Sequence, residues 1–173
     1  QSDDEYSRIF DDPLVSSIPG IDKMSVLGDV RRLDMTRRGT MWFFCVAAEC
    51  GLDRRTAAVE KTGSFLLDRA CATDGGFTLS WNPPLSISCR TGDMVHALVK
   101  TGFSDNRVAM AINWILTHQR HDGGWLHCPE ETLADSMKLI LFNRSGGGLR
   151  RENDPETPSC VHATGSCLRA LLD

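Results

Sequence analysis

The stretch HQRHDGGW (118–125) decides how this chain of 173 residues folds. Its Asp-Gly-Gly core supplies backbone positions with positive φ, which glycine adopts readily, so a helix can end there in a tight turn. An amphipathic helix is predicted before it, because Val108, Ile112 and Ile115 follow the i, i+4, i+7 spacing of one helix face. The tryptophan after the turn can then fold back. The stretch therefore predicts one end of a helical hairpin.

The same turn occurs earlier as ATDGGF (72–77), and each copy closes a longer repeat. The first unit spans 36–77 and the second spans 89–125. Each unit contains a polar stretch, an apolar helix, a link with Asp and Arg, and a second helix. Gly51 and Gly102 follow the first helices, where glycine caps are expected. The repeat predicts an all-α fold of helical hairpins.

A third unit is predicted over 160–173, because HATGSCLRAL (162–171) aligns with CRTGDMVHAL (89–98). This unit is truncated, since no second helix follows its first. One hairpin cannot bury its apolar face alone, so neighbouring units must stack. We therefore expect either that the chain is a fragment or that a partner completes the helical layer, and an oligomer is one such arrangement.

Two segments do not follow the repeat. Residues 1–35 are expected to form an N-terminal extension with short helices broken by prolines. Residues 144–158 are rich in glycine, proline and charge, which predicts a loop inserted between the second and third units. The repeat domain accordingly covers 36–173.

The segment HQRHDGGW resembles the Q-x-x-D-G-x-W signature of squalene–hopene cyclases, and it equally resembles the repeats of protein prenyltransferase β subunits. The resemblance to this prenyltransferase and squalene-oxidase repeat superfamily implies an α/α toroid over 36–173, here a partial one. In that fold, inner and outer helices alternate around a central cavity. The chain departs from the family in lacking the D-x-D-D acid motif of class II cyclases and the D-D-x-x-D magnesium motif of class I synthases.

A zinc site is predicted from cysteine and histidine residues at one end of the repeat. Protein prenyltransferases hold zinc with Asp, Cys and His, and this chain places Cys89 and His162 at the same position of successive units. Stacked helices lie about 10 Å apart, so such side chains can converge. Cys128 follows the second turn, and Cys160 lies two residues before His162. Four ligands would make a structural zinc site, whereas three would leave a position for a thiol or water. The alternative is that the cysteines are buried small hydrophobic residues, which fits Cys45, Cys50, Cys71 and Cys167 better.

Three further residues are candidates for the chemistry of a central cavity. Asp93 is predicted to open the second inner helix, where it serves either as a catalytic acid at the cavity rim or simply as a helix cap. Trp42 and His96 are candidates for a ligand pocket, with aromatic core packing and a satisfied core histidine as the alternatives.

Composition narrows the class of partner. The net charge of −4 gives no indication of a nucleic-acid partner, and no apolar run of about 18 residues predicts a membrane span. The acidic, polar N-terminus does not resemble a signal peptide, so a cytoplasmic location is expected. Two functions remain open. One is a zinc-dependent, prenyltransferase-like transferase that binds an apolar, isoprenoid-like ligand or a thiol substrate. The other is a non-catalytic toroid-like module that binds a partner protein or an apolar ligand, with structural zinc or no metal.

Overall fold

A computed structural model describes residues 39–78, 86–126, 156 and 158–172 of the chain. Within these residues the secondary structure is helical, apart from two isolated β-bridges. The helices are α3 (Thr40–Glu49), α4 (Ala57–Ala70), α5 (Ser88–Lys100), α6 (Asn106–Thr117) and α8 (Val161–Leu172). The predicted all-α class is confirmed for this part of the chain. The segment 1–35 and most of the loop 144–158 lie outside the described residues.

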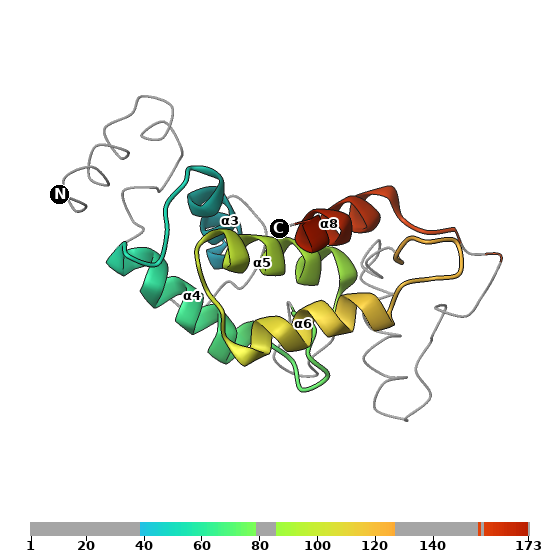
Figure 1. Ribbon diagram of the computed structural model, residues 1–173, viewed down its shortest axis with the longest axis horizontal. Coiled ribbons are helices and arrows are strands. Elements are labelled where there is room, and N and C mark those ends of the chain that lie inside the picture. The colour runs from blue at the N-terminus through green and yellow to red at the C-terminus, as the bar shows by residue number, and fades with distance from the viewer. Residues whose placement is uncertain (1–38, 79–85, 127–155, 157, 173) are drawn as a thin grey trace.

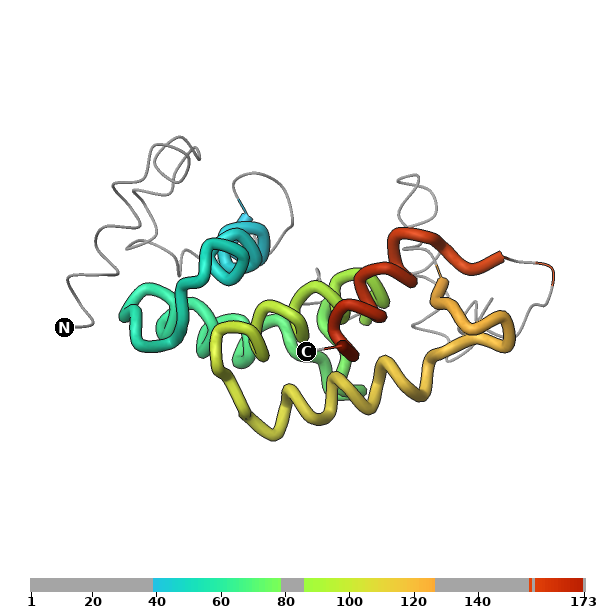
Figure 2. The backbone as a smooth tube through the Cα atoms, turned by 45° about the horizontal axis from the view of Figure 1, so that its top comes forward, coloured from blue at the N-terminus to red at the C-terminus, as the bar shows by residue number. Residues whose placement is uncertain are grey.

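The helices alternate between two layers (Figure 1). One layer contains α3, α5 and α8, and the other contains α4 and α6. The helices α5 and α8 lie side by side and run in the same direction (Figure 2). Each of α3 and α5 pairs with the helix that follows it in the sequence, so the two predicted hairpins are present.

Glycine caps end the first helix of each hairpin as the sequence predicts. Gly51 has a φ of +78° and Gly102 a φ of +88°. The residue after each glycine donates its backbone N–H five residues back, from Leu52 to Ala47 over 3.0 Å and from Phe103 to Leu98 over 2.8 Å. These bonds satisfy carbonyl groups that the helix end would otherwise leave unpaired.

The aromatic residues that follow the two turns are part of the core. Phe77 and Trp125 are fully buried, together with Phe44 and Met41 of α3. The indole Nε1 of Trp125 donates a 2.8 Å hydrogen bond to the carbonyl oxygen of Ile115 in α6. A buried indole N–H requires such an acceptor. The aromatic ring therefore closes each hairpin from its end, as expected.

The two Asp-Gly-Gly turns make the same contact with the segment before the next helix. In the first turn, Asp74 Oδ1 accepts the hydroxyl of Ser86 at 2.5 Å and the N–H of Gly76 at 3.0 Å. In the second turn, the equivalent bonds join Asp122 Oδ1 to Ser159 at 2.6 Å and to Gly124 at 3.2 Å. We call this arrangement the aspartate–serine clasp.

The two glycines of each turn are required for different steric reasons. Gly75 and Gly123 have φ values of +97° and +84°, which favour glycine. The second glycine allows close approach instead. A Cβ on Gly76 would lie 2.4 Å from Cβ of Ser86, and one on Gly124 would lie 2.5 Å from Cβ of Ser159. A side chain there would push the clasped segment away.

The helices α5 and α8 follow their respective turns in the same register. The backbone N–H of Phe77 donates to Thr91 Oγ1 at 2.9 Å, and that of Trp125 donates to Thr164 Oγ1 at 3.2 Å. The carbonyl oxygens of the same aromatic residues accept from the residues just before α5 and α8, at 3.1 Å and 2.8 Å respectively. The residues of α5 from Ser88 to Val99 therefore have equivalents in α8, with Thr91 matching Thr164.

Candidate functional site

A cluster of charged side chains joins α3, α5 and α8. It consists of Glu49, Asp93, His96, Lys100 and Arg169, and we call it the inner-layer cluster. Glu49 lies at its centre, with one carboxylate oxygen 2.8 Å from His96 Nε2 and the other accepting a 2.6 Å bond from Lys100 Nζ. Arg169 approaches that carboxylate at 3.6 Å and donates a 3.1 Å bond to Asp93 Oδ1. The cluster thus connects all three helices of one layer.

The electrostatics of the cluster favour an ionised Glu49. The hydrogen bond from Lys100, followed by that from His96, lowers the pKa of Glu49 from 4.5 to about 2. The Glu49 side chain is half-exposed, whereas the side chains of Asp93 and His96 are buried. Solvent screens the exposed part of the network, so its buried part carries most of the coupling between helices.

The structure places Asp93 differently from the sequence-based expectation. Helix α5 begins at Ser88, so Asp93 lies in its second turn and does not open the helix. Its interpretation as a helix cap is therefore wrong. The buried carboxylate instead forms an ion pair with Arg169 of α8. The pairing makes Asp93 a bridge between two helices, and its catalytic role stays a prediction.

The thiol of Cys45 lies beside the inner-layer cluster, and the thiol of Cys167 lies between α8 and α5. Burial, followed by the charge of Asp93, raises the pKa of Cys45 and of Cys167 to about 12. Cys45 donates to the carbonyl oxygen of Asp93 at 3.8 Å, and Cys167 donates to that of Ser88 at 3.4 Å. Both thiols are protonated at neutral pH, which makes them poor nucleophiles. As predicted, Cys167 is buried in the core, whereas Cys45 is partly buried and packs against it.

The predicted zinc ligands occupy contrasting environments. Cys89 is buried in the first turn of α5, whereas the equivalent His162 of α8 is exposed. Cys160 precedes α8 and donates its N–H to the carbonyl oxygen of Trp125 at 2.8 Å. In the part of the chain that the structure describes, no three His, Cys, Asp or Glu side chains gather into a group that could hold a metal ion. Cys128 lies outside that part, so the complete ligand set stays a prediction.

The two predicted pocket residues both contact other side chains. Trp42 is half-buried and meets Phe43 edge-to-face, with ring centroids 5.1 Å apart. His96 is buried and bonded to Glu49. Their roles in binding a ligand stay predictions, and the contacts fit their alternative roles in packing.

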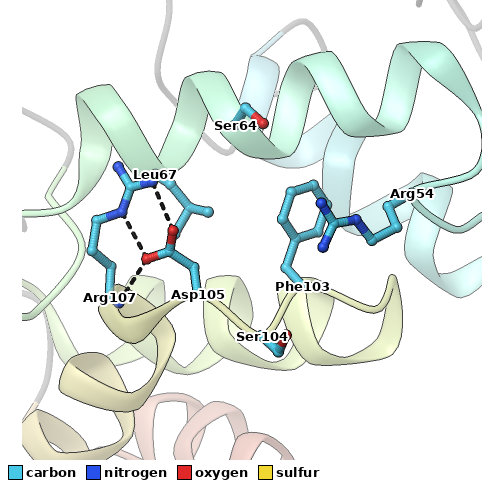
Figure 3. A pocket seen from close by; sticks show the side chains of 7 residues that line it. All are labelled: Arg54, Ser64, Leu67, Phe103, Ser104, Asp105 and Arg107. Carbon is cyan, nitrogen blue, oxygen red and sulfur yellow. Dashed lines mark hydrogen bonds and ion pairs between the residues drawn. The ribbon is translucent and has the colours of Figure 1, made fainter.

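A pocket of about 280 Å³, which the sequence does not predict, lies between α4 and the α5–α6 link (Figure 3). At one end, the guanidinium of Arg54 lies 4.8 Å from the centroid of the Phe103 ring. At the other end, Arg107 bonds to Asp105 and to Asp68 at 2.6–3.0 Å. The remaining lining residues are Ser64, Leu67 and Ser104. The sequence signal for this site is the Asp-x-Arg motif that occurs in both links between paired helices. Asp53 and Arg55 form the same local pair in the first link as Asp105 and Arg107 form in the second. Because Arg54 also bonds to Glu60, both arginines are already paired with acids.

An apolar surface on α8 is the second functional candidate. It consists of Val161, Gly165, Leu168 and Leu172, and we call it the α8 stripe. These residues are spaced i, i+4, i+7, i+11 along one helix face. The residue exposures are 89% for Val161, 46% for Leu168 and 86% for Leu172. A Cβ added to Gly165 would meet no atom within 4 Å.

The equivalent face of α5 is covered, and the helix that covers it is α8. A Cβ on Gly92 would lie 2.5 Å from the backbone carbon of Ser166, so the two helices touch at this glycine. The Cys167 thiol reaches the carbonyl oxygen of Ser88 on the same side. Val95, one turn along that face, is fully buried. The α8 stripe therefore repeats a helix-binding face, and none of the helices that the structure describes covers it.

None of the described helices is long and apolar enough to span a membrane. Comparisons of the chain with protein-family models, with curated proteins and with solved structures find no match.

Proposed function

We propose that this chain is a non-catalytic helical-repeat module that binds a partner protein through the α8 stripe, by extending the layer of α3, α5 and α8. The observation that carries the proposal is the contrast between equivalent positions of the repeat. Val95 of α5 is buried, and Leu168 of α8 is exposed although it occupies the same position. Exposed apolar surface of this kind is typical of interaction sites.

The inner-layer cluster supports a structural role over a catalytic one. Asp93 and His96 are the only two residues of the cluster with buried side chains, and each bonds to a charged residue of another helix. Buried polar groups that are paired in this way fix how helices pack. A general acid needs access to substrate, which the pairing of Asp93 with Arg169 opposes.

The two-layer alternation and the two Asp-Gly-Gly turns support an α/α toroid-type arrangement. They also support the resemblance to the prenyltransferase and squalene-oxidase repeat superfamily. In such an array each unit contacts its neighbours, so a face of a unit that no described helix covers is suited to another helix. The binding function follows from that architecture and requires no metal.

The test compares two charged substitutions at similarly exposed leucines. Leu168→Arg alters the α8 stripe, whereas Leu116→Arg alters α6, where Leu116 is 54% exposed. Proteins bound by the immobilised chain are identified and purified, and their affinities for both variants are measured. We expect Leu168→Arg to weaken binding at least about tenfold and Leu116→Arg to leave it unchanged. Equal affinity of both variants for every purified partner would contradict the proposal.

A zinc-dependent, prenyltransferase-like transferase is the second candidate function. The observation that favours it is the register of Cys89 and His162, which occupy equivalent positions on adjacent helices. Zinc content is measured on chain purified from zinc-supplemented medium under reducing conditions. This candidate predicts about one zinc per chain, lost in Cys89→Ser and His162→Ala but retained in the control Cys71→Ser. Wild-type chain without stoichiometric zinc would exclude it.

A further inference from the structure

The pocket between α4 and the α5–α6 link is built by contacts that fix its arginine and its aromatic ring. The backbone N–H of Arg54 donates a 2.9 Å bond to the carbonyl oxygen of Thr101, which ties the link before α4 to the end of α5. The Phe103 ring packs against α4 at Gly63, where a Cβ would overlap it. The Arg54 guanidinium lies over that ring and bonds to Glu60 through Nε and Nη2, at 2.9 and 3.1 Å. Two contacts therefore orient the guanidinium without a ligand.

Three groups at the pocket have no hydrogen-bond partner in the part of the chain that the structure describes. The pairing with Glu60 uses Nε and Nη2 of Arg54, and Nη1 bonds to none of the described residues. The hydroxyls of Ser64 and Ser104 form no hydrogen bond with those residues either. The two serines lie on opposite sides of the pocket, with Arg54 at one end and Arg107 at the other (Figure 3). Donors on several sides match an acceptor group whose oxygens point in several directions.

The charges that line the pocket favour an anion. Two arginines and one aspartate line it, which gives a net charge of +1. Asp105 accepts bonds from Arg107 through both carboxylate oxygens, so its charge is compensated. Glu60 and Asp68 bond to the arginines but do not line the pocket, and their side chains are 41% and 65% exposed. Exposed ion pairs contribute only about 0–1 kcal/mol, so an anion in the pocket can compete with these acids.

The size and the donors of the pocket indicate the chemical class of its ligand. A volume of about 280 Å³ lies at the lower limit for ligand pockets and admits a small molecule. A phosphate group presents acceptor oxygens on several sides, and arginine binds it through paired N–H donors. A carboxylate presents two oxygens in one plane and leaves donors on one side unused.

We propose that this pocket binds the phosphate group of a small molecule, with Arg54 Nη1 and the hydroxyls of Ser64 and Ser104 as donors. The site goes beyond the proposed function, because no residue of α8 lines it.

NMR titration of the isotope-labelled full chain with inorganic phosphate, at constant pH and ionic strength, tests the site. We expect saturable shifts of the Ser104 amide and the Arg54 Nε resonances, and a weaker response to acetate. Arg54→Gln removes a charge-assisted donor and should weaken phosphate binding at least about tenfold. Arg55→Gln is the matched control, because Arg55 pairs with Asp53 and does not line the pocket. This control should bind phosphate as wild type does, and circular dichroism verifies that both variants are folded.

A second variant makes the test independent of the stability of Arg54→Gln. Ser104→Ala retains both arginines and should weaken phosphate binding about twofold to tenfold. Titration with glycerol phosphate distinguishes the two sources of the group: tighter binding than that of inorganic phosphate supports a small phosphate ester, and equal or weaker binding supports free phosphate.

Three results would overturn the inference: no saturable shift with phosphate in wild type, acetate binding as tightly as phosphate, or undiminished phosphate binding in both Arg54→Gln and Ser104→Ala. Leu168→Arg should leave phosphate binding unchanged. A failure of the phosphate site therefore leaves the proposed function of the α8 stripe standing, and the reverse also holds.

Discussion

Replacing Gly92 by alanine should force α5 and α8 apart, because the new Cβ would lie 2.5 Å from the Ser166 carbonyl carbon and 2.7 Å from the Cys167 nitrogen. Ordinary contacts of this kind begin near 3.4 Å. These neighbours are backbone atoms, so relief requires a shift of the whole helix by about 1 Å. Overpacking on this scale costs about 1–3 kcal/mol. The higher helix propensity of alanine offsets about 1 kcal/mol of this cost, so we expect a net loss of up to about 2 kcal/mol.

The repeat supplies a matched control for this substitution. Gly165 occupies the equivalent position of α8, and a Cβ added there would have no neighbour within 4 Å. Gly165→Ala should therefore stabilise the isolated chain by about 0.5–1 kcal/mol through helix propensity alone. Urea denaturation at low protein concentration measures both changes. The steric reasoning is refuted if Gly92→Ala is at least as stable as wild type, or if both variants shift in the same direction.

Three further predictions concern the clasp, the inner-layer cluster and the buried thiols. Asp122→Ala and Ser159→Ala should each lower the free energy of unfolding, and a double-mutant cycle should show coupling, which additive losses would contradict. The pKa of Glu49 is depressed on folding, so its contribution is present above pH 4.5 and is lost as pH falls towards 2. Because the side chain is half-exposed, Glu49→Gln should lower the free energy of unfolding by at most about 1 kcal/mol at pH 7 and should not change it near pH 2. Urea titrations at both pH values measure this difference, and a loss of stability that does not depend on pH would contradict the prediction. Cys45 and Cys167 should resist alkylation in the folded chain at pH 7.5, as followed by mass spectrometry; labelling as fast as in urea would contradict their raised pKa values.

The turns and helix ends could be predicted from the sequence because their causes are local. Gly51, Gly102 and Gly123 have positive φ, and glycine is the residue that adopts it without strain. The start of α5 was harder to predict. Its N-cap is Ile87, which has no side chain able to accept a hydrogen bond, so the usual polar signal is missing. Asp93 carries such a signal, although the helix begins five residues before it.

The surroundings of the candidate site residues could not be predicted, because they depend on contacts between distant segments. Glu49 and Lys100 are bonded although 51 positions separate them. The alignment correctly paired Cys89 with His162 in backbone register, yet one is buried and the other exposed. The reason is that α8 covers α5, whereas no helix in the described part of the chain covers the equivalent face of α8. Equivalent positions of a repeat share a backbone geometry and do not share an environment.

Because the aspartate–serine clasp holds the start of the next helix, the repeat tolerates different lengths of chain between a turn and that helix. The same bonds join turn and helix whether the intervening chain is 78–85 or 126–158, which is about four times longer. Closing the longer connection costs only about 1.2 kcal/mol more in chain entropy. Insertions can therefore accumulate between a turn and the next helix while the helix keeps its place. That junction is where such a protein can acquire new loops at little cost to its fold.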